Sequence, residues 1–157
     1  MNTNFNQKLM QGKRGLVMGV ANNRSIAWGI AKALHNAGAE LAFSYQGEAI
    51  EKRIIPLAKE LGSDITIECD VSDEKSIINL IKKLENVWGK IDFLVHAIAY
   101  SDKNELTGRY IETSKENFIQ TMHISCYSFT SILKHAERIL NPNASMVTLT
   151  YSGAERV

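Results

Sequence analysis

Cysteine is scarce in this sequence, because Cys69 and Cys126 are the only two among 157 residues. Two cysteines cannot build a disulfide framework, so a reducing, cytoplasmic setting is expected. Long apolar runs are lacking as well: none approaches the ~20 residues of a membrane span, and residues 1–13 contain no apolar signal-peptide core. An excess of one charge is also lacking, and the net charge of +1 argues against a surface for nucleic acid or anionic membrane.

Motifs of several enzyme classes are missing too. The sequence contains no G-x-S-x-G, no CxxC and no Walker sequence. His35, His123 and His135 fall on predicted helices without partners at metal-ligand spacing, and no metal site is expected. His96 falls in an apolar strand, where a buried histidine with satisfied hydrogen bonds is favoured over a catalytic one.

What the sequence does contain is a regular alternation of apolar strands and amphipathic helices. Its length and its 45% apolar content suit one domain over residues 1–157. Strands are predicted at 16–20, 40–45, 65–69, 91–97 and 145–151. Helices are predicted at 26–37, 49–61, 73–88 and 114–140, with a loop at 100–112. This alternation predicts an α/β fold, a Rossmann-type doubly wound parallel sheet of strand order 3-2-1-4-5, with a ligand at the carboxyl ends of the first and fourth strands.

Capping residues and one apolar stripe define two of these helices further. Ser72 is expected to cap the third helix, and Thr113-Ser114-Lys115-Glu116 fits a capping box before the fourth. Asn141-Pro142-Asn143 is expected to end the fourth helix. The buried face of that helix is predicted to contain Phe118, Met122, Cys126, Phe129, Leu133 and Ala136.

The turn after the first strand is the strongest candidate for a phosphate site. Gly19 lets the chain turn and lets a ligand approach the backbone, and Ser25 can cap the helix and offer its hydroxyl to a phosphate. Gly29 would let the helix pack close to the strand. The pattern departs from G-x-G-x-x-G, so an ordinary turn with a serine cap is the alternative.

Polar residues follow the second and third strands. Gln46 can hydrogen-bond a ribose, and no Arg or Lys beside it would receive a 2′-phosphate, which favours NAD(H) over NADP(H). Asp70 can accept a hydrogen bond from an adenine amino group while Val71 covers the ring. The alternatives are a solvated glutamine and an aspartate that starts a turn or caps the next helix.

Small residues follow the fourth strand, and a tyrosine follows the fifth. Ala97 and Ala99 would let the backbone run beside a flat cofactor. Tyr151 would face the nicotinamide end of that cofactor, but a phenol needs a nearby cation to donate a proton at neutral pH, and no lysine follows it. A core or interface aromatic is the alternative.

Taken together, the chain resembles the NADH-dependent enoyl-(acyl-carrier-protein) reductases of bacterial type II fatty-acid synthesis, the FabI type. These are a divergent branch of the short-chain dehydrogenase/reductases. The resemblance rests on residues 19–21, 25–31, 40–46, 69–71, 96–99, 127–129, 140–142 and 149–156, which occur in this order over nearly the whole chain.

The resemblance implies an activity and a role for each site residue. The reaction would be hydride transfer from NADH to the β-carbon of a trans-2-enoyl thioester carried by acyl carrier protein, in a homotetramer. Gly19, Ser25 and Ile26 would hold the pyrophosphate. Gln46 would lie near the ribose, and Asp70 and Val71 would hold the adenine. Ile98 would lie along the cofactor, Tyr100 and Ser101 would lie near the acyl site, and Tyr151 would be catalytic.

One departure from the family is large. Its second tyrosine and the lysine at Tyr-x6-Lys spacing would lie beyond Val157, together with later strands and substrate-covering helices. The chain is therefore expected to be an incomplete dinucleotide-binding domain, inactive by itself, whose fifth strand is an open edge. A non-catalytic dinucleotide-binding module and a general short-chain dehydrogenase are the alternative functions. The helix at 114–140 would either form a subunit interface or only pack on the sheet.

Overall fold

The computed structural model of the chain describes residues 9–155. Residues 1–8 lie outside the described residues, and they make up most of the segment 1–13 that was considered for a signal peptide. Arg156, in the segment 149–156 that contributes to the family resemblance, also lies outside them. One parallel sheet has the order β3-β2-β1-β4-β5, so the predicted strand order is confirmed. The strands are β1 (Arg14–Met18), β2 (Glu40–Tyr45), β3 (Thr66–Glu68), β4 (Ile91–His96) and β5 (Leu140–Thr148).

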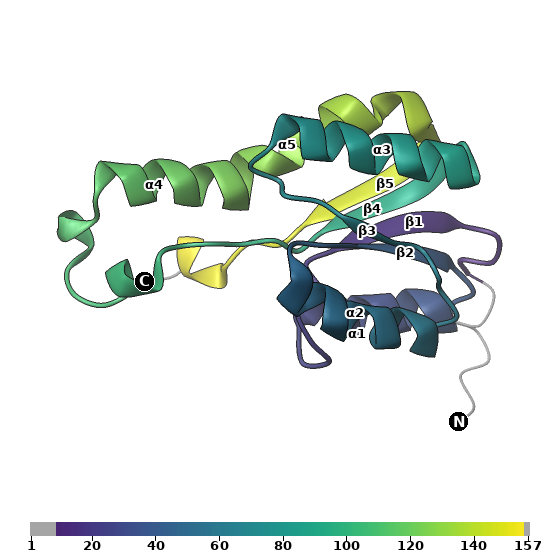
Figure 1. Cartoon of the computed structure of the whole chain (residues 1–157), viewed down its shortest axis with the longest axis horizontal. Helices are drawn as coiled ribbons and strands as arrows, with labels where there is room; N and C mark the ends of the chain where they lie inside the picture. The colour runs from purple at the N-terminus through teal and green to yellow at the C-terminus, as the bar shows by residue number, and fades with distance from the viewer. Residues whose placement is uncertain (1–8, 156–157) are drawn as a thin grey trace.

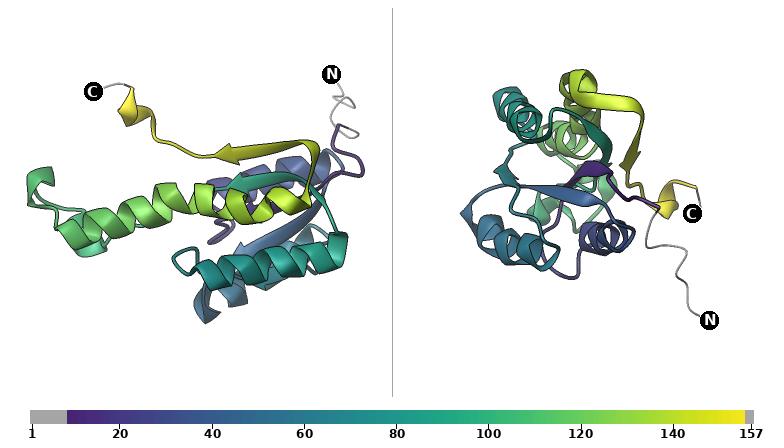
Figure 2. Two further views of the ribbon diagram at one scale, coloured as in Figure 1. Left: turned by 90° about the horizontal axis from the view of Figure 1, so that it is seen from above. Right: turned by 90° about the vertical axis from the view of Figure 1, so that its right-hand side faces the viewer.

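Helices cover both faces of this sheet. α1 (Ile26–Asn36) and α2 (Glu48–Glu60) lie on one face, and α3 (Glu74–Trp88) and α5 (Ser128–Ala136) lie on the other (Figure 1; Figure 2, right). α4 (Lys115–Met122) continues into α5 through a π-helical turn, His123–Tyr127, and projects beyond the sheet (Figure 1). Among the described residues, no helix is long and apolar enough to cross a membrane.

Two apolar cores explain why the middle of each central strand is apolar on both faces. Val17 and Val95 pack toward α1 and α2 with Phe43, while Leu16 and Leu94 pack toward α3 and α5. A strand that is covered on both faces contributes alternate side chains to two cores, so it does not alternate between apolar and polar residues. The parallel pairing of β1 with β4, from Gly15 with Phe93 to Met18 with His96, places their carboxyl ends side by side.

Two predicted strands are displaced by two or more residues. β1 covers Arg14–Met18 rather than 16–20, and β5 covers Leu140–Thr148 rather than 145–151. The predicted end of the long helix is wrong as well: α5 stops at Ala136, a 3-10 turn covers Glu137–Ile139, and residues 141–143 lie within the strand instead of ending the helix. Residues 141–144 form a bulge between two paired positions of β5. The pairing with β4 shifts there from Ile91 with Leu140 to Phe93 with Ser145, and Asn143 adopts a φ of 64°.

Two predicted caps are displaced by one residue. Asp73, not Ser72, caps α3, because its carboxylate accepts a hydrogen bond from the Lys75 backbone N–H at 3.0 Å. Ser72 is held instead by Asp70 in the preceding turn. Ser114, not Thr113, caps α4, and its hydroxyl accepts from the Asn117 backbone N–H at 3.1 Å.

The predicted buried face of the long helix is wrong in its first half. Phe118 and Met122 are about half exposed, at 49% and 45%, and Cys126 is exposed. The physical reason is that α4 extends past the sheet, so the sheet does not cover this face (Figure 2, left). Ala136 is buried as predicted, because α5 packs on the sheet beside α3.

Candidate functional site

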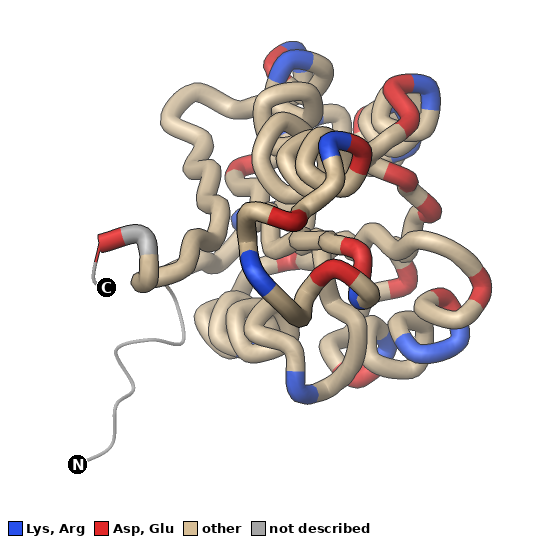
Figure 3. The backbone as a smooth tube through the Cα atoms, turned by 90° about the vertical axis from the view of Figure 1, so that its left-hand side faces the viewer, with Lys and Arg blue, Asp and Glu red and all other residues tan. Residues whose placement is uncertain are grey.

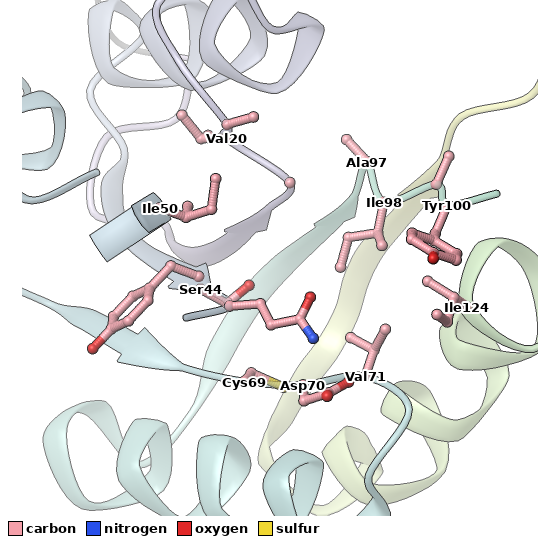
Figure 4. A pocket seen from close by; sticks show the side chains of 15 residues that line it. Val20, Ser44, Ile50, Cys69, Asp70, Val71, Ala97, Ile98, Tyr100 and Ile124 are labelled. Carbon is pink, nitrogen blue, oxygen red and sulfur yellow. The ribbon is translucent and has the colours of Figure 1, made fainter. Parts of the chain in front are cut away.

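A hollow of about 250 Å³ opens where the carboxyl ends of β1, β2, β3 and β4 converge. Figure 4 shows Val71, Ile98 and Ile124, from three different segments, around this space. We call it the first hollow, and its lining includes Gly19, Gln46, Asp70, Val71, Ile98 and Tyr100. Six of the residues that the sequence predicted for a site are therefore brought together.

Gly19 makes the turn after β1 possible. Its φ of 95° is rarely adopted by residues with a side chain, and a Cβ atom here would overlap the carbonyl oxygen of Ala97. The turn thus passes directly against the end of β4. The predicted role of Gly29 is wrong, since a Cβ there would meet no atom within 4 Å and the residue is exposed.

A second hollow, of about 340 Å³, continues the first one toward the amino end of α1. The two share Gly19 and the segment 97–99, so together they form one groove with Ile98 at its middle. Ser25, Ile26 and Tyr151 line the second hollow, as does Ala27. The two ends of the groove therefore present different chemical groups, as a ligand with two different ends would require.

The amino end of α1 supplies unpaired donors to this second hollow. Among residues 9–155, no atom accepts a hydrogen bond from the backbone N–H groups of Ile26 and Ala27. Ser25 occupies the capping position, but its hydroxyl donates to the carbonyl of Asn22 at 2.7 Å instead of accepting from the helix. Ser25 therefore occupies the predicted cap position, but the hydrogen bond expected of a capping side chain is not formed. Free N–H groups at a helix start, with the helix dipole, favour an anion there.

Asp70 combines a turn with a charged acceptor at the edge of the first hollow. One carboxylate oxygen accepts from the Ser72 N–H at 2.8 Å and from the Ser72 hydroxyl at 2.6 Å. Burial opposes ionisation, but these bonds and the Gln46 side chain hold the pKa of Asp70 below its usual value. The residue therefore starts a turn, as one reading of the sequence expected, and is also an ionised acceptor beside Gln46.

Tyr100 and Ser101 are separated although they are adjacent in sequence. Tyr100 lines the first hollow, whereas Ser101 lines a third hollow of about 410 Å³ between the loop at 103–113 and α4. Tyr151 is 80% exposed at the open end of the second hollow. The structure thus does not bring Ser101 and Tyr151 to one site.

His96 confirms the interpretation of a satisfied buried histidine. Its ring lies 2.7 Å from the Ser128 hydroxyl through Nε2 and 3.2 Å from the Thr148 hydroxyl through Nδ1. Ser128 donates its own proton to the carbonyl of Ile124 at 2.7 Å, so Nε2 carries the proton and donates to Ser128. Burial lowers the pKa of His96, which keeps the ring neutral.

Two groove residues have no counterpart in the sequence analysis. Ile50, near the start of α2, and Ile124, in the π-helical turn, both line the first hollow. Ile50 follows Gly47 at a helix start, a position that could have suggested it. No sequence pattern marks Ile124, because its orientation depends on the π-helical turn.

Charge does not single out the groove. Lys and Arg positions are interspersed with Asp and Glu over the end of the molecule drawn in Figure 3. In the described part of the chain, no three His, Cys, Asp or Glu side chains form a group that could hold a metal ion. Binding at this site would rest on backbone donors, single polar side chains and apolar contact.

Comparison with known proteins gives the family. A family model described as enoyl-(acyl carrier protein) reductase matches residues 19–157. An NADH enoyl-acyl-carrier-protein reductase of Rhizobium meliloti is 60% identical over 149 residues, which are 95% of this chain and 55% of that protein.

Two solved structures are similar in fold as well as in sequence. FabI from Candidatus Liberibacter asiaticus has a TM-score of 0.92 at 56% identity, covering 96% of this chain and 58% of that chain. The reductase from Anaplasma phagocytophilum, solved in complex with NAD, has a TM-score of 0.91 at 54% identity with the same coverage. The chain thus spans somewhat more than half the length of these relatives. It belongs to the enoyl-(acyl carrier protein) reductase family.

Proposed function

We propose that this chain holds NADH in an enoyl-acyl-carrier-protein reductase of fatty-acid synthesis. The observation that carries the proposal is the groove, which joins Gln46 and Asp70 at one end to the free N–H groups of α1 and to Tyr151 at the other. A dinucleotide has this order of groups: an adenosine, an anionic pyrophosphate and a nicotinamide. The Anaplasma relative, with NAD in its structure, supports the choice of ligand.

The residues of the groove fit such a ligand in chemistry. Gln46 offers an amide to ribose hydroxyls, and the ionised Asp70 can accept a hydrogen bond from an adenine amino group. Val71, 6% exposed, offers an apolar surface to the adenine ring. The N–H groups of Ile26 and Ala27 can donate to the pyrophosphate. Ile98 lies between these two ends.

For chemistry, the bound dinucleotide would supply a hydride, and this chain would supply orientation. Ile98 and Ala99 would lie along the cofactor and direct its reactive end toward Tyr151. An enolate that forms during reduction needs a hydrogen-bond donor. Among the residues around Tyr151 in the second hollow there is no lysine to assist the phenol as a proton donor. We therefore expect this chain to bind NADH without turning over an enoyl thioester.

Calorimetry with NADH tests the binding half of the proposal. The variant Gln46→Ala should bind NADH about 3- to 10-fold more weakly, as loss of one hydrogen bond implies. Gln120→Ala is the matched control, because Gln120 is exposed on α4 and lines none of the hollows described above. No saturable binding by the unaltered chain would refute the proposal, and an equal loss in both variants would refute the site.

A spectrophotometric assay at the NADH absorbance band tests the second half. With crotonyl thioester as substrate, the 157-residue chain should show no NADH oxidation above the buffer control. Turnover that Tyr151→Phe abolishes would contradict the argument that this phenol lacks a supporting cation. Turnover that this variant leaves intact would remove Tyr151 from the proposed site.

The remaining expectations extend the same proposal. We propose one dinucleotide-binding domain for the chain, a substrate carried by acyl carrier protein, a tetrameric assembly and a cytoplasmic location. The family supports the substrate class. The assembly and the location stay predictions.

A further inference from the structure

A stripe of polar side chains runs along α4, the π-helical turn and α5. Its members are Asn117, Thr121, Ser125 and Ser128, spaced by four, four and three residues, which places them on one helical face. Asn117 and Ser128 are buried, at 7% and 0% exposed. The helix thus turns this polar face inward, while Phe118 and Met122 on its apolar face are exposed.

This polar stripe contacts the segment that leaves β4, residue by residue and in opposite direction. The contacts pair Ser128 with His96, Ser125 with Tyr100, Thr121 with Ser101, and Asn117 with Asp102. β4 ends at His96, and the Ala97 N–H still donates to the Met18 carbonyl of β1. In the described part of the chain, no backbone hydrogen bond to a neighbouring strand holds residues 98–102, and side chains of the helix bond to three of them instead.

Ser125 makes the contact that bears most directly on the groove. Its hydroxyl accepts from the Tyr100 N–H at 3.0 Å and donates to the Tyr100 carbonyl at 3.1 Å. A hydroxyl can do both at once, and so one side chain satisfies both backbone groups of Tyr100. Tyr100 lines the first hollow, and Ile98, two residues earlier, lines both hollows.

The contact coincides with the π-helical turn. Such turns are rare and are often found at functional sites. Here, adjacent residues of the turn have different tasks: Ile124 lines the first hollow while Ser125 holds Tyr100. Gln46, Asp70 and Val71, at the other end of the groove, follow β2 and β3, and the side-chain hydrogen bonds of Ser125 in the described residues go to Tyr100 and to none of these three.

We propose that Ser125 is a positioning residue for the cofactor. By fixing the segment 97–101, its hydroxyl sets the part of the groove from Ile98 toward Tyr151, where the nicotinamide end of NADH would lie. The inference rests on the proposed function. It predicts that Ser125 affects ligands that extend past Ile98 and not ligands confined to the adenosine end.

Two readouts on the 157-residue chain test this proposal. The first is the hydrogen-exchange rate of the Tyr100 amide by nuclear magnetic resonance, which needs no cofactor. The second is the calorimetric affinity for NADH compared with that for ADP, which lacks the nicotinamide end. Ser125→Ala should speed Tyr100 exchange and weaken NADH binding about tenfold, as loss of two hydrogen bonds implies, with ADP binding unchanged.

Three further variants sharpen the result. Ser125→Thr keeps the hydroxyl and should restore both readouts, and Ser145→Ala, at an exposed position in β5, should behave as the unaltered chain. Ser125→Cys keeps the size but bonds weakly, and it replaces the alanine variant if that one does not fold.

Unchanged Tyr100 exchange in Ser125→Ala would overturn the proposal, as would an equal loss of NADH and ADP binding. If the unaltered chain binds neither ligand, the proposed function fails. The exchange rate of Tyr100 then still decides whether Ser125 holds the segment.

Discussion

The turn at Gly19 gives the sharpest test of how this chain builds its groove. Replacing Gly19 with alanine adds one methyl group at a φ of 95°, where L residues are strained by about 1–2 kcal/mol. The same methyl group would overlap the backbone oxygen of Ala97, which cannot rotate away as a side chain could. The end of β4 must therefore shift.

The size of the effect follows from what this shift breaks. The Ala97 N–H donates to the Met18 carbonyl at 3.2 Å and ties the two strand ends together. Loss of that bond adds about 1 kcal/mol to the strain, for a total of about 2–3 kcal/mol. For a chain of this size, that predicts a melting temperature lower by about 4–12 °C. Thermal unfolding followed by circular dichroism measures it, and NADH affinity should fall in parallel.

Gly29→Ala is the matched control in the same strand-turn-helix unit. Gly29 lies within α1 with nothing within 4 Å of its would-be Cβ, so alanine should stabilise the chain by about 0.5–1 kcal/mol. The reasoning is refuted if Gly19→Ala melts at or above the temperature of the unaltered chain. It is also refuted if both variants lose stability equally.

Three other outcomes follow from titratable groups that are buried or partly buried. Burial lowers the pKa of His96 from 6.5, so below that pH the unfolded chain binds a proton that the folded chain does not. The free energy of unfolding measured with urea should therefore fall as pH drops below 6.5. It should fall less steeply in His96→Gln. Burial raises the pKa of the Cys69 thiol to about 11, so an aromatic disulfide reagent should react quickly with Cys126 alone until urea exposes the second thiol. Burial works against ionisation of Asp92, yet hydrogen bonds from Arg14, Lys13 and Asn141 lower its pKa, so acid should destabilise the unaltered chain more than Asp92→Asn as pH falls through that lowered pKa.

The strand order and the strand-end residues could be predicted because they depend on burial. A strand between two cores needs apolar residues on both of its faces, and the nearly continuous apolar stretch over 91–97 fits that requirement. Once the order was known, Gly19, Gln46 and Asp70 had to meet, since the carboxyl ends of parallel strands share one edge. His96 could be understood in the same way, as a polar residue in an apolar strand.

The details that failed depend on competition between neighbouring groups. Ser72 and Asp73 can both cap a helix, and the contact of Ser72 with Asp70 decided between them. The stripe that starts at Phe118 is apolar, yet α4 buries Asn117 instead. Asn117 faces the segment that follows β4 and forms hydrogen bonds with Ser101 and Asp102. The bulge at Asn143 lets β5 begin five residues earlier than apolar periodicity indicated.

The central claim is that the groove between the strand ends holds a dinucleotide, and one titration tests it most directly. Isotope-labelled chain is titrated with NADH, and backbone amide shifts are followed residue by residue. Saturable shifts should be concentrated at Gly19, Gln46, Val71 and Ile98, and be absent from Leu106 in the third hollow. No saturable shift at millimolar NADH, or shifts centred on the third hollow, would contradict the account.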